Sequence, residues 1–599
     1  MSRFLAASAL FALIAVSATA QDAADSVAPE AGTATVFAAE TPDVKAALAA
    51  KAAGEPVEAG QWMVAAANPL AVKAGADVLA EGGSAADAMV AVQAVLGLVE
   101  AQSSGLGGGA FLVWYDAATD RLTTLDGRET APRDATPKLF LDENGEPLQF
   151  YEAVVGGRSV GTPGTPRLME AAYARWGKLP WAGLFDDAIA LAEGGFTVSP
   201  RLAGLIAEDG DRLGRFQPTR DYFFPNGKAL AAGDTLTNAA YGATLRAMAA
   251  DGANAIYTGD IAADIVDTVK GAEGNPGRLS LADLAAYRVI ERAPVCVTYH
   301  AYDVCGMGPP SSGALTVGQI LGMVAEKDIA GLGPDNPESW RLIGDASRLA
   351  FADRGRYMAD IDFVPMPLKG LVAPEYLEMR AKLLDGEKAL ESVAPGAPGW
   401  DHAMIEYGDG TAIELPSTTQ IVIVDSDGNA LSMTSTIENG FGSRLMTKSG
   451  FLLNNELTDF SFETHDADGY PIANRVEPGK RPRSSMAPTI VMKDGKPVLV
   501  IGSPGGSSII GYVAQAVIAY LDWGMNVQEA VSMPHLLNRF GTYDVEAGTS
   551  AEDMVAPLEA MGFKVKVGDQ TSGLQAIAIE DGRLYGAADP RREGIALGE

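Results

Sequence analysis

Two runs of apolar and β-branched residues in the last third of the chain predict a hairpin. Residues 420–424 pair naturally with residues 430–436 across a three-residue loop that ends in a glycine, a common hairpin connection. In that register Thr418 lies opposite Thr436 and Glu438 follows two residues later, whereas a two-residue Asp-Gly loop would shift the pairing by one. The pattern predicts two hydroxyls and a carboxylate at the open end of the hairpin, although threonine is also an ordinary strand residue.

Helix signals dominate much of the chain before this hairpin. Asn68 followed by proline is typical of a helix start, and Ser84 with Asp87 has the spacing of a capping box. The second of these helices is apolar on every face over residues 88–99, which indicates burial on all sides. Residues from about 165 to 400 are predicted to be mostly helical.

A second hairpin is predicted closer to the C-terminus. Residues 489–501 form a strand pattern on both sides of Asp494-Gly495, a dipeptide that favours tight turns. The chain then passes through Gly505 and Gly506 into a helix that begins near residue 508. This order places a glycine pair between a strand and a helix start.

The N-terminus has the features of a secretory signal peptide at residues 1–20. Arg3 supplies a positive charge, residues 5–16 are apolar, and residues 18–20 are small and suited to cleavage. The apolar run is short for a membrane span, so export to the periplasm or the medium is favoured over an uncleaved anchor. Residues 21–60 lack a sustained period and predict a flexible lead-in.

The composition is that of a large, acidic, globular protein. Of 599 residues, 47% are hydrophobic and 20% are charged, and 45 basic against 77 acidic residues give a net charge of −32. Such a surface repels phosphate backbones and anionic lipid. Nucleic acid and membrane surfaces are therefore not expected partners.

The two cysteines lie close together in the sequence. Residues 295–305 alternate around a possible turn at 300–301, and this register would place Cys296 directly opposite Cys305. Export to an oxidising compartment favours a disulfide. The turn residues are poor hairpin formers, so two buried free thiols remain the alternative.

Histidine is scarce, which restricts the chemistry available to this chain. No two histidines have the spacing of metal ligands, and nothing in the sequence supports a zinc site or a Ser-His-Asp triad. We expect neither a metal nor a cofactor. The histidines are His300, His402, His465 and His535.

Short motifs along the chain occur in a characteristic order. In the C-terminal part they are Thr418-Thr419, Asn454-Asn455-Glu456-Leu457-Thr458-Asp459-Phe460, Lys480-Arg481-Pro482-Arg483-Ser484-Ser485-Met486 and Gly502-Ser503-Pro504-Gly505-Gly506-Ser507. In the N-terminal part they are Asn68-Pro69, Glu100-Ala101-Gln102-Ser103-Ser104-Gly105, Asp126-Gly127-Arg128-Glu129-Thr130-Ala131-Pro132 and Pro309-Pro310-Ser311-Ser312-Gly313. Together these motifs resemble the gamma-glutamyltransferases over roughly residues 60–599. The resemblance is specific to the N-terminal-nucleophile hydrolase superfamily, and less so to one substrate.

The resemblance implies an α+β fold, a four-layer αββα sandwich built jointly by two subunits of one precursor. Cleavage between Ser417 and Thr418 would leave residues 61–417 as the large subunit and residues 418–599 as the small catalytic subunit, which stay together as a heterodimer. A threonine hydroxyl is a weak nucleophile, but a free α-amine with a pKa of about 7.7–8.0 can accept its proton. Thr418 would thus supply both nucleophile and base.

The resemblance also implies roles for other residues. Thr436 matches the threonine that hydrogen-bonds the nucleophile, and Gly505 and Gly506 match the pair whose N–H groups form an oxyanion hole. The substrate's α-carboxylate would be held by an arginine and two serines, because a planar guanidinium suits a carboxylate. Its α-ammonium would meet a cluster of acids. The residues that match these binding roles are Arg128, Ser484, Ser485, Glu438, Glu456 and Asp459.

Two departures from the family pattern concern the substrate pocket. Many members have asparagine where this chain has Glu438, and the glutamate adds a negative charge. The stretch between Asp459 and Ser484 is shorter than in members with a full lid. A reduced lid leaves the site more open and gives Tyr470 no assigned role.

The resulting hypothesis is a self-processing hydrolase and transpeptidase of γ-glutamyl amides such as glutathione. It passes the glutamyl group to water or to the amine of an amino acid or dipeptide. One alternative is a glutaryl or cephalosporin acylase, whose substrate offers no ammonium to the three acids. The other is a non-catalytic periplasmic amino-acid-binding protein, which would need no nucleophile.

Overall fold

The computed structural model describes residues 41–599 except 411 and 413. The expected signal peptide at residues 1–20 lies outside the described residues. Within the described residues, no helix combines the length and the apolar character needed to cross a membrane.

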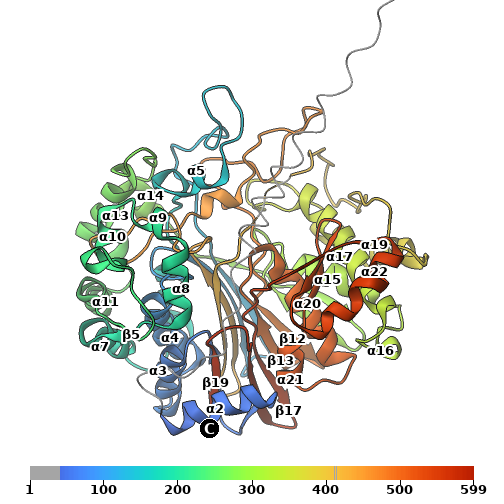
Figure 1. The fold of residues 1–599 in the computed structure, drawn as a ribbon, viewed down its shortest axis with the longest axis horizontal. Coiled ribbons are helices and arrows are strands. Elements are labelled where there is room, and N and C mark those ends of the chain that lie inside the picture. Colours follow the sequence, from blue (N-terminus) through green and yellow to red (C-terminus); the bar gives the residue numbers. More distant parts are fainter. Residues whose placement is uncertain (1–40, 411, 413) are drawn as a thin grey trace, which may run out of the picture.

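Two antiparallel sheets of seven strands form the centre of the molecule (Figure 1). The first sheet contains, in spatial order, β19 (Ile595–Gly598), β2 (Met63–Ala66), β10 (Thr418–Val424), β11 (Ala430–Thr436), β3 (Gly109–Asp116), β4 (Arg121–Gly127) and β7 (Ile290–Arg292). The second contains β1 (Val57–Ala59), β18 (Arg583–Ala588), β17 (Gln575–Glu580), β13 (Lys496–Gly502), β12 (Thr489–Lys493), β9 (Tyr302–Gly306) and β8 (Val295–Tyr299).

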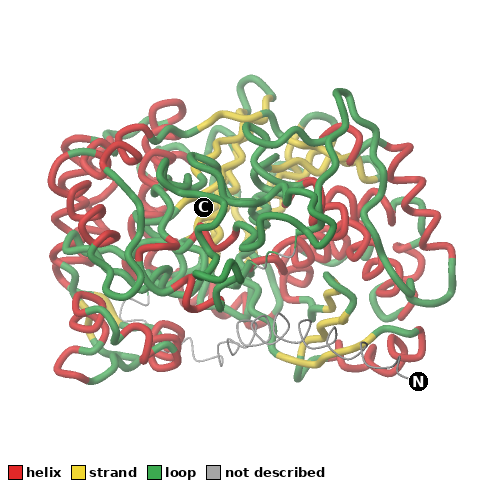
Figure 2. The backbone as a smooth tube through the Cα atoms, turned by 90° about the horizontal axis from the view of Figure 1, so that it is seen from above, coloured by secondary structure: helices red, strands yellow, loops and turns green. Residues whose placement is uncertain are grey.

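Helices cover the outer face of each sheet, and Figure 2 shows them on both flanks of the strands. The helices packed on the first sheet include α3 (Pro69–Ala80), α4 (Ala85–Val99) and α6 (Thr165–Trp176). Those packed on the second sheet include α15 (Gly313–Val324), α20 (Ile509–Leu521) and α21 (Val527–Ser532), with α17 (Pro337–Tyr357) against α15. As the sequence predicts, Ser84 and Asp87 form a capping box at the start of α4, which is buried on every face.

Alternation along the strands creates three apolar layers. In β10, Ile421 and Ile423 face the helices beside the first sheet, while Val422 and Val424 face the second sheet. In β13, Val500 faces the first sheet. Because successive side chains of a strand point to opposite faces, each sheet is apolar on both sides and must be covered twice. The predicted four-layer αββα sandwich is confirmed.

The hairpin of β10 and β11 has the predicted register. Thr418 lies opposite Thr436, and Val424 lies opposite Ala430. Gly428 in the connecting loop has a φ of 82°, the left-handed conformation that glycine adopts without steric cost. Both threonines therefore stand at the same end of two central strands.

Each sheet mixes strands from both sides of residue 418. The first sheet inserts β10 and β11 between β2 and β3, and the second places β12 and β13 between β9 and β17. The segments before and after Thr418 thus share one core.

The lead-in is more ordered than the sequence indicated. Residues Pro42–Ala53 form helix α2, and β1 pairs with β18. Lys51 Nζ donates to the carbonyls of Arg592 at 2.9 Å and Gly594 at 2.6 Å. These partners are more than 500 residues away in the sequence, so no local sequence pattern predicts the contacts.

The two cysteines are joined in a disulfide. Cys296 in β8 lies directly opposite Cys305 in β9, and the turn between the strands places His300 at a φ of 53°. The cysteines of the described chain include no free thiol.

Candidate active site

The end of the β10–β11 hairpin brings two hydroxyls to one peptide carbonyl. Thr418 Oγ1 donates to the carbonyl oxygen of Ser417 at 2.7 Å, and Thr436 Oγ1 donates to the same oxygen at 2.8 Å. The two hydroxyl oxygens are 3.2 Å apart. All three residues are buried. Two hydroxyls therefore meet at the carbonyl of the Ser417–Thr418 bond, a geometry that permits attack by one and hydrogen bonding by the other.

Neighbouring backbone groups fix this arrangement. The N–H of Glu438 donates to Thr436 Oγ1 at 2.9 Å, which leaves the threonine proton free to point at the Ser417 carbonyl. Glu438 has a φ of 75°, a conformation that costs a non-glycine residue energy and is concentrated at functional sites. Ser417 Oγ donates to the Gln102 carbonyl at 2.8 Å. The N-terminal motif at residues 100–105 thus anchors the residue before Thr418.

Arg592 holds Thr418 from the other side. Its Nη1 donates to the carbonyl oxygen of Thr418 at 2.9 Å, and its Nη2 donates to the carbonyl of Thr571 at 3.0 Å. A residue near the C-terminus therefore fixes the backbone of the first residue of β10.

A pocket of about 220 Å³, here called the acidic pocket, opens beside Thr418. Its lining includes one arginine and four carboxyl groups. It brings together most of the catalytic and binding residues predicted from the sequence. The lining residues are Arg128, Glu414, Leu415, Thr418, Thr436, Glu438, Glu456, Asp459, Ser484, Met486, Gly506 and Ile509.

Arg128 is the centre of the acidic pocket. Its guanidinium forms ion pairs with Glu456 and Asp459 and donates to the carbonyls of Pro482 at 3.2 Å and Arg483 at 2.9 Å. Its side chain is 1% exposed, so these partners must compensate its charge. Glu456 and Asp459 occupy one short helix, η5 (Glu456–Asp459), that follows the predicted Asn-Asn-Glu motif.

Burial raises the pKa of several acids around Arg128. It raises the pKa of Glu456 and of Asp459, and Arg128 opposes that rise. Burial raises the pKa of Glu438 to about 7, against hydrogen bonds from the Leu415 N–H and the Asn455 amide. Burial also raises the pKa of Glu129, the residue that follows Arg128 in the sequence, to about 8. Burial thus disfavours the charged form of these acids, and a cation bound beside them would favour it.

Several acid oxygens around Arg128 are buried without a hydrogen-bond donor among the described residues, including Glu456 Oε2 and Asp459 Oδ1. Asp459 Oδ2 pairs with Arg128, but Oδ1 is buried without a hydrogen-bond partner among the described residues. Leaving a buried carboxylate oxygen unpaired costs free energy. An ammonium group carries three donors and could satisfy it.

The segment before Thr418 lies in the acidic pocket. The carboxylate of Glu414 forms an ion pair with Arg354 and lies 3.7 Å from Arg483 Nε. Burial would raise the pKa of Glu414, but these arginines hold it below its usual range. Residues before Thr418 thus form part of the pocket wall, and two arginines beside the pocket hold the carboxylate of Glu414.

The glycine pair lies against the same segment. Gly505 and Gly506 have φ values of 137° and 56°, and a Cβ on Gly506 would lie 2.5 Å from the Glu414 carbonyl oxygen. The next N–H, of Ser507, donates to that oxygen at 3.2 Å. The turn between β13 and α20 therefore presents one N–H, that of Ser507, to the Glu414 carbonyl.

The two serines are held by residues of the N-terminal part. Ser485 Oγ accepts from Arg354 Nη2 at 2.7 Å, and Ser484 Oγ accepts from the Met486 N–H at 3.1 Å. Ser312 Oγ donates to the Ser484 carbonyl at 2.7 Å and accepts from Arg354 Nε at 2.8 Å. The Pro-Pro-Ser-Ser-Gly motif therefore positions the serine segment beside the pocket.

Sequence reasoning assigned no role to several residues of this site. Glu129 and Arg483 lie within quoted motifs, and each adjoins an assigned residue, which is a usable signal. Arg354 lies in a long helix, and Arg592 lies near the C-terminus. Their partners are 60 and 174 residues away, so only the fold identifies them.

Comparisons with known proteins agree with this geometry. The family model described as gamma-glutamyltranspeptidase matches residues 71–599. The glutathione hydrolase proenzyme of Bacillus subtilis (strain 168) is 38% identical over 552 residues, which cover 90% of this chain and 91% of that protein. The acylase ACY 1 proenzyme of Pseudomonas sp. (strain SE83) is 33% identical over 551 residues, covering 91% of this chain and 94% of that protein.

A solved structure extends the similarity to the whole fold. The crystal structure of a cephalosporin acylase from Bacillus halodurans matches with a TM-score of 0.80 and 26% identity, covering 91% of this chain and 97% of that one. The family model and the relatives span most of the chain. The protein belongs to the gamma-glutamyltranspeptidase family.

Proposed function

We propose that this protein is a precursor that cleaves itself between Ser417 and Thr418 and then acts on γ-glutamyl amides such as glutathione. The observation that carries the proposal is the pair of threonine hydroxyls on the Ser417 carbonyl, beside a pocket with one arginine and several acids. The two hydroxyls on the carbonyl support the self-cleavage reaction. The charges of the pocket support the substrate class.

In self-cleavage, Thr418 Oγ1 attacks the carbonyl carbon of Ser417. The Thr436 hydroxyl stabilises the negative charge that develops on the carbonyl oxygen. The C–N bond then breaks, the Thr418 nitrogen takes a proton, and Ser417 is left as an ester on Thr418 Oγ1. Water hydrolyses this ester to a Ser417 carboxylate and regenerates the hydroxyl, now beside a free α-amine.

In the second reaction, the free amine of Thr418 accepts the proton of its own hydroxyl as Oγ1 attacks the γ-carbonyl of the substrate. The leaving amine takes that proton, and the γ-glutamyl group remains as an ester on Thr418. Water or a second amine attacks the ester and restores the hydroxyl. The N–H groups at Gly505 and Gly506 are suited to bind the oxyanion once residues 414–415 have left them.

A zwitterionic glutamyl group suits the charges of the acidic pocket. Arg128 can exchange a carboxylate partner for the substrate's α-carboxylate, and Ser484 and Ser485 lie beside it. The ammonium would occupy the position next to the unpaired Asp459 Oδ1, with Glu456 and Glu438 nearby. A glutaryl group carries no ammonium and would leave these acids without a partner.

Denaturing electrophoresis followed by N-terminal sequencing of the smaller fragment tests the first step. We expect two fragments, the smaller beginning with Thr418. A single chain that persists after purification and incubation would refute self-processing.

Chromogenic amides test the substrate. We expect the processed protein to hydrolyse γ-glutamyl-p-nitroanilide faster than glutaryl-p-nitroanilide. The reverse preference would assign it to the acylase branch, which the similarity to ACY 1 and to the cephalosporin acylase makes the second candidate.

Export to the periplasm or the medium completes the proposal. It rests on the signal-peptide pattern at residues 1–20 and on the Cys296–Cys305 disulfide, which suits an oxidising compartment. Recovery of the protein from a periplasmic extract, with a new N-terminus near Gln21, is the expected result. Retention in the cytoplasm with Met1 intact would contradict it.

A further inference from the structure

Asn474 is a buried side chain that joins two segments of the active site. It is 1% exposed and lies outside the lining of the acidic pocket. Its Nδ2 donates to the carbonyl oxygen of Asp459 at 2.7 Å, and its Oδ1 accepts from the N–H of Arg483 at 2.9 Å. One amide thus connects the segment that carries the acids to the segment that carries the two serines.

These two hydrogen bonds close a ring with Arg128. The carbonyl of Arg483 accepts from Arg128 Nη2 at 2.9 Å, and the same nitrogen forms the ion pair with the side chain of Asp459. Asn474 therefore binds the backbone of both residues that Arg128 contacts through Nη2. The ion pair is one link of the ring, and the hydrogen bonds of Asn474 are two others.

The backbone around Asn474 is itself held in place. Lys480 Nζ, on a fully buried side chain, donates to the carbonyls of Ala473 at 2.7 Å and Arg475 at 3.1 Å, the residues before and after Asn474. The carbonyl of Asn474 accepts from the N–H of Ser461 at 2.9 Å. Moving the amide would break several buried hydrogen bonds, each of which costs free energy to lose. Asn474 is therefore a rigid spacer between the two segments.

The proposed substrate depends on the separation that this spacer sets. The ammonium and the carboxylate of an α-amino acid are attached to one carbon, so the groups that bind them must lie a short, fixed distance apart. In the structure, the ion pair between Arg128 and Asp459 keeps these groups together. When Arg128 turns to the substrate's carboxylate, this pair is weakened. The hydrogen bonds of Asn474 are then the links of the ring that still hold Asp459.

We propose that Asn474 is a positioning residue, which holds Asp459 at the distance from Arg128 that the ammonium and carboxylate of one substrate require. This inference rests on the proposed function. Because Asn474 does not line the acidic pocket, it acts through Asp459 and takes no part in the chemistry at Thr418. Its loss should weaken turnover of substrate and leave self-cleavage, which binds no ammonium, at its original rate.

A double-mutant cycle in the processed full-length protein tests this proposal. Asn474→Ala removes both hydrogen bonds, and we expect kcat/KM for γ-glutamyl-p-nitroanilide to fall about tenfold, because small misplacements of binding groups are costly. In the Asp459→Asn background the positioned acid is already neutral, so the same change should lower kcat/KM less than about threefold. The rate at which the precursor converts to two fragments should be unchanged by Asn474→Ala.

Asn275 supplies the matched control. It is 5% exposed, donates from Nδ2 to the carbonyls of Glu152 at 3.0 Å and Val155 at 3.1 Å, and accepts at Oδ1 from Arg158 Nε at 2.8 Å. It also lies outside the acidic pocket. Asn275→Ala removes hydrogen bonds of the same kind and should change kcat/KM by the same factor in both backgrounds.

An equal loss from Asn474→Ala in both backgrounds overturns the proposal, and so does a slowing of self-cleavage that parallels the loss of turnover. If Asn474→Ala does not fold, Asn474→Leu takes its place in the cycle, since leucine is similar in size and forms neither hydrogen bond. The expected and contrary results stay the same. A wild-type protein that releases no p-nitroaniline would instead refute the proposed function.

Discussion

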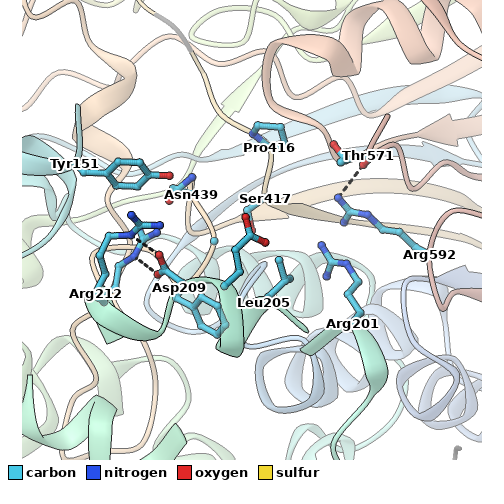
Figure 3. Close-up of a pocket in the computed structure, with 14 residues that line it drawn as sticks. Tyr151, Arg201, Leu205, Asp209, Arg212, Pro416, Ser417, Asn439, Thr571 and Arg592 are labelled. Carbon is cyan, nitrogen blue, oxygen red and sulfur yellow. Dashed lines mark hydrogen bonds and ion pairs between the residues drawn. The ribbon is translucent and has the colours of Figure 1, made fainter. Parts of the chain in front are cut away.

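Two pockets border the Ser417–Thr418 bond, one lined by Ser417 and the other by Thr418, and they differ in the charges that line them. The acidic pocket is lined by four carboxyl groups and one arginine. The second pocket, here called the arginine pocket (Figure 3), is lined by two acids and by Arg201, Arg212, Arg444 and Arg592. The chain's own Glu414 and Leu415 form part of the wall of the acidic pocket. Ser417 and Thr418, although adjacent in the chain, thus border pockets whose linings have opposite charge balance.

The largest expected effect comes from Thr418, which lines the acidic pocket. Thr418→Ala removes the proposed nucleophile, so the precursor should remain one chain and activity should fall by about 10³-fold or more. Electrophoresis and p-nitroanilide release measure the two effects. Thr418→Ser retains a hydroxyl and should still be cleaved, more slowly. Processing of the alanine variant would show that another group cuts the chain.

Asp459→Ala tests whether the acidic pocket binds the ammonium group of the substrate. The variant should lose about 10²-fold in kcat/KM for γ-glutamyl-p-nitroanilide, because a buried charge contact is removed. Turnover of glutaryl-p-nitroanilide should fall much less. Asp459→Asn keeps the side-chain shape and separates charge from packing. Equal losses for both substrates would refute the assigned role.

Glu414→Gln tests whether the precursor segment is held by its charge. The carboxylate is paired with Arg354, so its loss should loosen the segment and slow self-cleavage about three- to tenfold. The rate at which purified precursor converts to two fragments measures this. Glu406, exposed in the same segment, provides the control substitution Glu406→Gln. An unchanged rate would mean that the Ser417 contacts alone fix the scissile bond.

The smallest expected effect concerns the pH dependence of stability in the acidic pocket. The pKa of Glu129 rises to about 8 on burial, above the unfolded value of about 4.3. The protonated form therefore contributes stability that is complete below pH 4.3 and is lost as the pH rises through 8. From pH 5 to 8, the Tm of the wild type should fall by about 2 °C relative to Glu129→Gln. A constant difference in Tm would contradict this.

The sequence predicted those parts of the molecule that local patterns encode. The β10–β11 register followed from strand periodicity and a loop glycine, and the start of α4 followed from Ser84 and Asp87. The family motifs indicated Arg128 and the acids around it. Helix α2 was missed because its residues lack an amphipathic period and its anchor, Lys51, binds the distant C-terminal segment.

The arginine pocket was missed for a related reason. Its arginines come from α8 (Pro200–Glu208), α9 (Gly210–Leu213), the loop after β11 and the C-terminal segment, and none belongs to a motif. Each looks like an ordinary surface charge in the sequence. Only the fold brings them together, so their arrangement could not be inferred before the structure.

The interleaving of strands from both sides of residue 418 has a consequence for the life of the enzyme. Before cleavage, an unfolded molecule can refold by itself, because all fourteen strands of the two sheets belong to one chain. After the proposed cleavage, refolding would require two separate fragments to meet, and its equilibrium would depend on their concentration. The precursor would thus fold reversibly, whereas the cleaved protein would stay folded only because it unfolds slowly. Its lifetime would be set by the activation barrier to unfolding.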